Sequence, residues 1–171
     1  MERFEIRIVG VGGQGIRIAG IVLATAAVIN GLFATHWPSY GVEARGGPSI
    51  SDIVISREEI DYPRVLAADV LAALNQEMLS KYLDSLKPNG ILILDSSLII
   101  ENSKRRNITI KKASLIDTAK GIGEPSMVNM IMLGVLVNST RIVSVESMIK
   151  AIKETTGLNR NLEAFKLGLK L

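Results

Sequence analysis

Four glycines lie close together near the start of the chain, in the segment GVGGQG at residues 10–15. Gly10, Gly12 and Gly15 have the G-x-G-x-x-G spacing, between an apolar run that predicts a strand and one that predicts a helix. In such a turn the glycines permit a sharp bend, close approach of the backbone to a phosphate, and packing of the helix on the strand. The helix N-terminus also offers free N–H groups and positive partial charge to an anion. The segment therefore predicts either a phosphate-binding turn or a packing turn without a ligand.

A dinucleotide-binding site needs one further residue that this segment lacks. Such sites carry Asp or Glu near the end of the second strand, where the carboxylate holds the ribose. Here the second predicted strand, 32–35, is followed by His36 and Trp37, with neither an acid nor an evident Arg for a 2′-phosphate. A P-loop is also excluded, because no Gly-Lys-Ser/Thr follows the glycines. An NAD-dependent dehydrogenase is therefore the less favoured alternative.

A second segment, 36–48, is rich in side chains that bind rather than pack, and its prolines and glycines predict a loop. Loops at the carboxyl ends of parallel strands surround the ligand crevice, so we expect this loop to face the glycine turn. An ion pair between Arg45 and Glu43, and burial of Tyr40 at an interface, are the alternatives for these side chains. The candidate binding residues are Gly10, Gly12, Gly13, Gln14, Gly15, Ser39, Tyr40 and Arg45.

The elements that must position these segments alternate between strands and helices. Strands are predicted at 4–9, 32–35, 49–56, 90–97 and 108–113, and helices at 16–30, 76–86, 126–139, 144–156 and 159–170. The segment 68–74 fits either state. This order predicts a single domain over residues 1–171, with an α/β fold: a Rossmann-like three-layer domain with a mostly parallel sheet and a helical C-terminal part.

The composition restricts the chemistry of the chain. Among 171 residues there are no cysteines and one histidine, which excludes thiolate zinc sites and cysteine-bound iron–sulfur clusters and predicts no metal site. We also find no nucleophile–base arrangement, so no catalytic residue is assigned. The net charge of +3 is small and the basic residues at 104–112 are expected to be solvated, so we predict no nucleic-acid partner. No apolar run reaches the length of a membrane span, and no leader peptide is evident, which favours a cytoplasmic location.

Four segments taken together resemble the gamma subunit of 2-oxoacid:ferredoxin oxidoreductases. They are GVGGQG at 10–15, PSYGVEARGG at 38–47, AADVLAALNQE at 67–77 and NMIMLG at 129–134. The resemblance spans roughly residues 5–153, and the combination is far more specific than a single glycine motif. The SYGVEARGG form of the second segment is more similar to the 2-oxoglutarate enzymes than to the pyruvate enzymes.

The resemblance implies a subunit that is not active alone. The family oxidatively decarboxylates a 2-oxoacid with coenzyme A (CoA) and reduces ferredoxin. The resemblance also implies partner subunits: alpha and beta subunits and a ferredoxin-like delta subunit. These partners are expected to carry thiamine diphosphate, magnesium and iron–sulfur clusters. This chain has no Gly-Asp-Gly signature for magnesium diphosphate, so we expect it to bind none of these cofactors alone. CoA is then the phosphate-bearing ligand left for the glycine turn, with Arg45 adding a charge-assisted contact.

Assembly with the catalytic subunits is the main role that we expect. The segment 126–139 is apolar on almost every side, so it must be buried in the core or against a partner, where Asn129 needs a hydrogen-bond partner. Asn75 and Asp95 follow strand-like runs and are expected to cap helices or turns rather than bind a ligand. A free-standing nucleotide- or CoA-binding Rossmann-like protein is the main alternative function. Whether the isolated chain forms a homodimer is left open.

Overall fold

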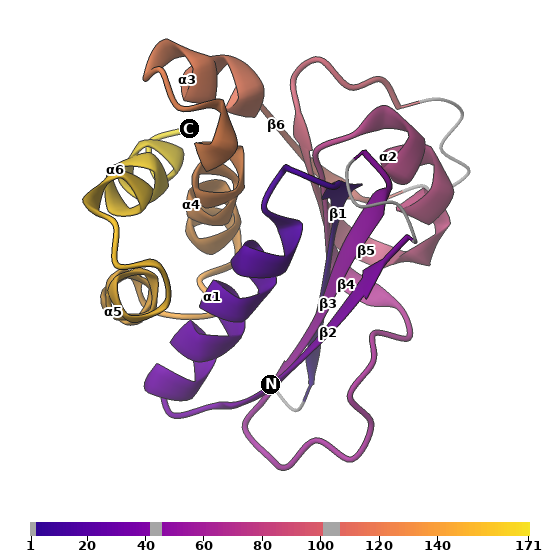
Figure 1. The fold of residues 1–171 in the computed structure, drawn as a ribbon. Helices are drawn as coiled ribbons and strands as arrows, with labels where there is room; N and C mark the ends of the chain where they lie inside the picture. Colours follow the sequence, from indigo (N-terminus) through magenta and orange to yellow (C-terminus); the bar gives the residue numbers. More distant parts are fainter. Residues whose placement is uncertain (1–2, 42–45, 101–106) are drawn as a thin grey trace.

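A six-stranded sheet with helices on both faces forms the described part of the chain (Figure 1). The computed structural model describes residues 3–41, 46–100 and 107–171. The strands are β1 Phe4–Val11, β2 Phe33–Tyr40, β3 Pro48–Ser56, β4 Ala68–Ala73, β5 Leu86–Asp95 and β6 Thr109–Ala113. The helices are α1 Ile16–Ile29, α2 Gln76–Tyr82, α3 Leu115–Gly121, α4 Val128–Thr140, α5 Val145–Thr156 and α6 Asn159–Gly168, with 3-10 turns η1 Leu83–Ser85 and η2 Pro125–Met127.

The strand order is β2-β3-β1-β4-β5-β6. Only β3 runs against its neighbours in this sheet, and β1, β4, β5 and β6 pair in parallel, so the predicted α/β fold with a mostly parallel sheet is confirmed. In the dinucleotide-binding order, the second strand pairs directly with the first. Here β3 lies between β1 and β2, which separates the end of β2 from the turn after β1.

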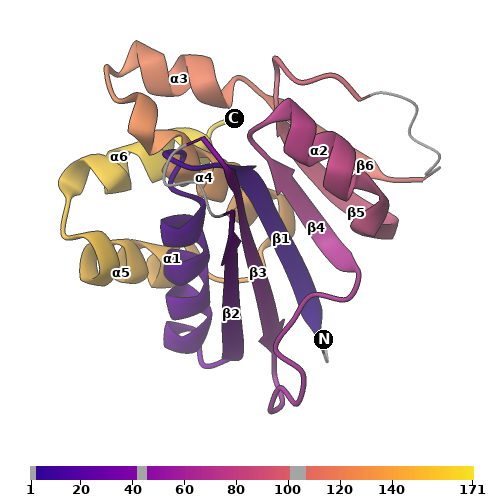
Figure 2. The same cartoon turned by 45° about the vertical axis from the view of Figure 1, so that its right-hand side comes forward.

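The two faces of the sheet have separate apolar cores. On one face, α1 and the C-terminal helices pack over Ile6, Ile53 and Ile93, with Phe165 of α6 fully buried. On the other face, α2 and η1 cover residues such as Leu71 and Leu92 (Figures 1 and 2). This gives the three predicted layers, with one outer layer much larger than the other.

Helix α4 lies inside the larger layer, as the apolar segment 126–139 predicts. Every residue from 128 to 137 is buried. Its neighbour α6 approaches so closely that a Cβ on Gly134 would collide with the carbonyl oxygen of Phe165. Gly134 of α4 and Gly168 of α6 allow the two helix backbones to come into contact, so the helices pack closely at this crossing.

Two predicted boundaries are wrong. The segment 36–48 was expected to be a loop, but β2 continues to Tyr40 and forms an antiparallel hairpin with β3. Pro38 is tolerated within it because β2 is an edge strand, where a residue without an N–H costs no ladder hydrogen bond. Strand β5 likewise begins at Leu86, within the helix expected over 76–86 and ahead of the strand expected at 90–97. The extra residues are accommodated by a register shift between Ala68 and Val70, with Asn89 in the left-handed region at φ 63°.

Candidate functional site

The glycine turn joins β1 to α1 at the carboxyl end of β1. Gly13 and Gly15 have φ values of 98° and 69°, which side-chain-bearing residues rarely adopt. Gly10 is still within β1, where a Cβ would lie 2.8 Å from Cδ1 of Ile16. The glycines therefore satisfy the backbone and packing needs of the turn before any ligand is considered.

Gln14 holds the turn closed with both ends of its side-chain amide. Its Oε1 accepts a hydrogen bond from the N–H of Val11 at 2.9 Å, and its Nε2 donates to the carbonyl oxygen of Leu74 at 2.9 Å. Leu74 directly follows β4, so Gln14 links the ends of two neighbouring strands. The side chain therefore braces the turn through both its amide oxygen and its amide nitrogen.

Asn129 of α4 packs against the start of α1. Its Nδ2 donates to the carbonyl oxygen of Gly15 at 3.1 Å, and its Oδ1 accepts from the N–H of Met130 at 2.9 Å. The hydrogen-bond partner that the sequence demanded for this buried amide is thus the glycine turn itself. A Cβ on Gly15 would lie 2.9 Å from Cγ of Asn129, so only glycine fits beneath it.

The glycine turn also contacts the β2–β3 hairpin, as expected from the sequence. The N–H of Gly12 donates to the carbonyl oxygen of Gly47 at 2.8 Å, which joins the turn to the residue before β3. The two glycine-rich segments thus meet at one end of the sheet. Glu43 and Arg45 lie outside the described residues.

Several backbone N–H groups at the turn remain available. Within the described residues, no hydrogen bond uses the N–H of Gly13 or Gly15. The first-turn N–H groups of the 14-residue α1 have no intrahelical acceptor, and its first turn carries no acidic side chain. These donors and the positive end of the helix dipole would favour an anion at this point.

A hollow of about 290 Å³ lies beside the turn. Its wall combines Gly13 and Gly15 with residues of α4, α5 and α6, and most of these present apolar surface. Apart from the residues next to it in the chain, no atom of the described residues lies within 4 Å of the position where a Cβ of Gly13 would stand. A ligand could therefore reach the free N–H groups without displacing a side chain.

Ser39 does not join the glycine turn. Side chains alternate along β2, and Ser39 shares with Trp37 the face of the sheet away from α1, where both line another hollow. Tyr40 ends β2 at the same end of the sheet as Gly10, because the backbones of both residues pair with Ser49 of β3. The side chain of Tyr40 lies outside the described part of the structure. The structure thus brings together the glycines, Gln14 and the end of the hairpin, and separates Ser39 from them.

His36 lies beneath α1 and has a structural contact. Its Nε2 is 2.9 Å from Oγ of Ser51, and that hydroxyl donates to the carbonyl oxygen of Ile16 at 3.0 Å. Because the hydroxyl proton points to Ile16, Nε2 must donate to Ser51. Burial lowers the pKa of His36, and the nearby positive charge of Arg17 lowers it further, so the neutral ring is favoured.

A largely buried ion pair in the sheet escaped the sequence analysis. Arg7 and Asp52 stand directly opposite each other on β1 and β3, with hydrogen bonds of 2.7 and 2.8 Å between guanidinium and carboxylate. Their side chains are 13% and 11% exposed. Burial opposes the charge of Arg7, but the bonds to Asp52 outweigh it and raise the pKa of the guanidinium. Charged residues in two otherwise apolar strands, Glu5 and Arg7 in β1 and Asp52 in β3, were the available signal, but only the register shows that Arg7 and Asp52 meet.

Asn75 and Asp95 serve the backbone, as predicted. Asn75 caps α2 by accepting the N–H of Met78 at 3.1 Å. Asp95, which is buried, accepts the N–H groups of Ser97 at 2.9 Å and of Ile116, in the first turn of α3, at 2.8 Å. Burial alone would raise the pKa of Asp95, but these bonds and the Ser97 hydroxyl lower it. Both side chains thus have a structural role.

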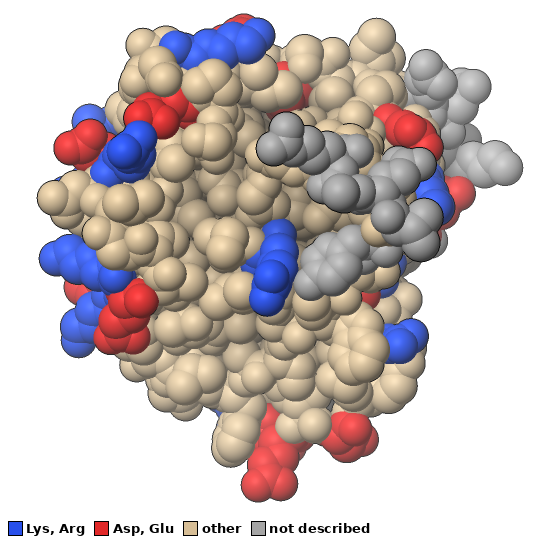
Figure 3. Space-filling view, in the orientation of Figure 1, with Lys and Arg blue, Asp and Glu red and all other residues tan. Residues whose placement is uncertain are grey.

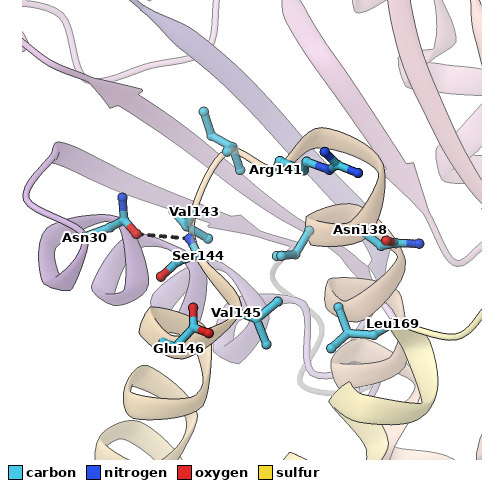
Figure 4. Close-up of a pocket in the computed structure, with 10 residues that line it drawn as sticks. Asn30, Asn138, Arg141, Val143, Ser144, Val145, Glu146 and Leu169 are labelled. Carbon is cyan, nitrogen blue, oxygen red and sulfur yellow. Dashed lines mark hydrogen bonds between the residues drawn. The ribbon is translucent and has the colours of Figure 1, made fainter.

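Another hollow, of about 500 Å³, lies between the ends of α1 and α4 and the start of α5, at the end of α1 away from the glycine turn. Figure 4 shows the residues that line it. Asn30 bridges its wall by accepting the N–H of Ser144 at 3.0 Å, which fixes the start of α5. Ligands of open α/β sheets bind at the carboxyl ends of the strands, so the smaller hollow beside Gly13 is the better candidate.

The surface and the remaining residues restrict other kinds of site. Basic and acidic side chains are intermixed around the face in Figure 3 rather than gathered in one basic patch. Within the described ranges, no three His, Asp or Glu side chains are grouped so that they could hold a metal ion. No helix in that part of the chain is long and apolar enough to cross a membrane.

Comparison with known proteins gives consistent relatives. The family described as pyruvate ferredoxin/flavodoxin oxidoreductase matches residues 5–171. The 2-oxoglutarate synthase subunit KorC of Methanothermobacter marburgensis is 44% identical, over 99% of this chain and 96% of that protein. The gamma subunit of a keto/oxoacid ferredoxin oxidoreductase from Geobacter sulfurreducens is 36% identical with a TM-score of 0.88, over 99% of this chain and 96% of that one. A 2-oxoglutarate:ferredoxin oxidoreductase from Magnetococcus marinus, solved with 2-oxoglutarate, coenzyme A and succinyl-CoA bound, has a TM-score of 0.89 at 25% identity, over 99% of this chain and 31% of that one.

Proposed function

This chain belongs to the pyruvate ferredoxin/flavodoxin oxidoreductase family, and we propose that it is the gamma subunit of a multisubunit 2-oxoacid:ferredoxin oxidoreductase. The observation that carries the proposal is the end-to-end match, in sequence and in fold, to proteins that are themselves single subunits. A chain that matches one subunit over nearly its whole length is expected to do that subunit's work.

The 2-oxoacid that we propose is 2-oxoglutarate. Two observations support it: the SYGVEARGG form of residues 39–47, and the similarity to a subunit named for 2-oxoglutarate synthase. The substrate would be bound by other subunits, so this choice concerns the whole complex.

We further propose that this chain contributes assembly and placement rather than redox chemistry. Its residues do not fit iron–sulfur clusters, because it has no cysteine, and they lack a thiamine diphosphate signature. Thiamine diphosphate, magnesium and the clusters would therefore belong to alpha, beta and ferredoxin-like delta partners. On a partner, thiamine diphosphate would supply the carbanion stabilisation of the decarboxylation.

We propose the glycine turn as a site for a phosphate of CoA. The free N–H groups of Gly13 and Gly15 and the start of α1 would hold the phosphate oxygens. The mainly apolar hollow beside Gly13 would receive an uncharged part of the same ligand. Gln14 would hold the backbone in place without contacting CoA, and Arg45 and Tyr40 remain proposed contacts from the hairpin. Ser39, on the far face of the sheet, has no geometric support for this role.

No observation favours an NAD-dependent dehydrogenase. In a dinucleotide-binding site the ribose-binding acid ends the strand that pairs directly with the first strand. Here that place is taken by β3, which runs antiparallel to β1, and β2 is one strand further away. A protein working without partners is also not favoured, since the relatives are subunits.

Co-purification tests the proposed function. The chain should be tagged and expressed with the alpha and beta subunits encoded in the same genome. We expect the subunits to co-elute as one particle in size-exclusion chromatography, with 2-oxoglutarate-dependent reduction of ferredoxin in that fraction. Separate elution of the chain from an active alpha–beta enzyme would refute the proposal.

A charge substitution at Gly13 tests the CoA site in the assembled enzyme. The Gly13→Asp variant places a carboxylate among the N–H groups, while Gly13→Asn imposes the same backbone strain and nearly the same volume without charge. We expect the KM for CoA to be about tenfold higher in Gly13→Asp than in Gly13→Asn, with the KM for 2-oxoglutarate unchanged. Equal CoA values in the two variants would show that no phosphate binds at this turn.

A further inference from the structure

In the part of the chain that the structure describes, the helices leave part of one face of the sheet uncovered. Helix α2 packs over β1 and β4, and within the described residues no helix covers the same face of β2 and β3 (Figure 2). A hollow of about 370 Å³ occupies this place. Its floor and rim carry polar and aromatic side chains, in contrast to the apolar hollow beside the glycine turn.

At the floor of this hollow, the positive side chain of Arg7 and the negative side chain of Asp52 are paired with each other. The Arg7 guanidinium and the Asp52 carboxylate neutralise each other through two hydrogen bonds. A third hydrogen bond, at 3.3 Å, runs from Arg7 to the carbonyl oxygen of Val65. An incoming charged group would therefore find no unmet charge at the floor.

The rim is different, because Arg64 has no acidic partner among the residues that the structure describes. Its guanidinium carbon lies 4.5 Å from the centre of the Trp37 ring. Among the described residues it has no ion pair, and its side chain has no hydrogen bond. Stacking uses the flat face of a guanidinium and leaves the N–H groups along its edge free, in the fork that fits a carboxylate.

The backbone beneath this rim is held in place. Arg3 donates to the carbonyl oxygens of Tyr62 at 3.0 Å and of Arg64 at 2.8 Å. The hydroxyl of Thr35 donates to the carbonyl oxygen of Pro63 at 2.9 Å. The segment that presents Arg64 is thereby held by the residue before β1 and by β2, so little backbone freedom would be lost on binding.

We propose that the rim formed by Trp37, Tyr62 and Arg64 docks a carboxylate-bearing segment of another subunit of the enzyme. The side chains of Trp37 and Tyr62 are 44% and 45% exposed. Aromatic and Arg residues are enriched at the buried centres of protein interfaces, where they contribute most of the binding free energy. The positive charge of Arg64, which has no ion pair within the described ranges, selects Asp or Glu on the partner, paired through two N–H groups. This inference rests on the proposed function, because it requires an assembly with other subunits.

Charge reversal tests the docking rim. Arg64→Glu should weaken binding of this chain to the alpha–beta subunits about tenfold or more, and the loss should shrink as salt is raised. Arg57→Glu is the matched control, because Arg57 is exposed in the same β3–β4 connection but does not line the hollow. It should change the dissociation constant less than about twofold. Unchanged thermal unfolding of the free Arg64→Glu chain would exclude misfolding.

The outcomes separate this inference from the proposed function. If the wild-type chain does not bind the alpha–beta subunits, both fail. If the wild-type chain binds and Arg64→Glu binds equally well, only the docking rim fails.

A zero-length cross-link identifies the bound group. In the assembled complex of the Arg64→Lys variant, a carbodiimide should join the amine at position 64 to an Asp or Glu of another subunit, with loss of one water. The Arg57→Lys complex should give no such link at position 57. Mass spectrometry would locate the linked peptides. A link from position 64 only within this chain or to a second copy of it, or no link at all, would overturn the assignment.

Discussion

The glycine turn and the Arg64 rim are both open to solvent, but they are built in opposite ways. At the turn, Gln14 and Asn129 point inward to hold the backbone, and the peptide N–H groups face outward. At the rim, Arg3 and Thr35 hold the backbone carbonyl groups from within, and large side chains face outward. Outward N–H groups suit a small anion that can approach closely, whereas outward Trp, Tyr and Arg side chains suit a protein surface.

The largest effect on stability is expected beneath the rim, at the Arg7–Asp52 pair. Arg7→Val should lower the free energy of unfolding by about 3 kcal/mol or more, because it leaves the Asp52 carboxylate largely buried without a partner. The double variant Arg7→Val with Asp52→Val removes both charges and should be more stable than the single variant. Urea unfolding measures both. A double variant that is less stable than Arg7→Val would mean that Asp52 needs no partner.

The next effect concerns the packing of the turn. Gly15→Ala should cost about 2–3 kcal/mol, from backbone strain plus overlap with Asn129. Gly13→Ala adds the same methyl group at a positive φ but into open space, and should cost only about 1 kcal/mol from strain. The two variants are compared by urea unfolding of the free chain. Equal losses would show that Asn129 does not press on the turn.

A smaller effect is expected from the side chain that braces the turn. Gln14→Ala leaves the Val11 N–H and the Leu74 carbonyl without their partner and should cost about 2 kcal/mol. Gln76 makes the same pair of bonds to the backbone of Ile99, but at an exposed position. Gln76→Ala should therefore cost less than about 1 kcal/mol, because water replaces the lost bonds. A larger loss for Gln76→Ala would contradict the inward bracing of the turn.

The smallest effect is a pH dependence from His36, which lies between α1 and the hairpin. Burial lowers its pKa below the ordinary 6.5, so the unfolded chain binds this proton more readily than the folded chain. The neutral ring therefore stabilises the fold fully above pH 6.5, and this contribution is lost as the pH falls through 6.5 towards the folded pKa.

Thermal unfolding at pH 7.5 and pH 5.5 measures the effect. The wild type should lose more stability over this interval than His36→Gln, which cannot titrate. Glu5 and Asp95 do not contribute to the change between pH 7.5 and pH 5.5. Their pKa values are lowered from the ordinary 4.5 and 3.8, so these carboxyl groups take up protons only in more acidic solution. Identical losses in the two proteins would mean that His36 is equally basic in the folded and unfolded chain.

The sequence predicts most elements of the fold because the apolar periods are clear. The glycine turn, α1 and the buried α4 follow from local patterns. The extent of β2 does not, since Pro38 and Gly41 have the appearance of a loop and only the edge position makes the strand tolerable. The place of β3 between β1 and β2 is equally hidden, because the pairing of strands is set by long-range packing rather than local sequence.

For the candidate site, the sequence predicts where the glycine turn lies but not what the side chains around it do. Glycines at a strand–helix junction identify the turn, but an amide side chain such as Gln14 looks the same whether it binds a ligand or the backbone. Ser39 was grouped with the turn because it was placed in a loop, and the alternation of β2 puts it on the other face. Arg64 and Trp37 are separated in the sequence and become neighbours only through the fold.

The most direct test of the central claim is an add-back assay. The alpha, beta and delta subunits are prepared without this chain, and 2-oxoglutarate- and CoA-dependent reduction of ferredoxin is measured before and after the purified chain is added. We predict no turnover by the chain alone, little by the incomplete enzyme, and full activity once the chain is present in equal amount. Ferredoxin reduction by the solitary chain, or an incomplete enzyme already fully active, would contradict its role as an assembling gamma subunit.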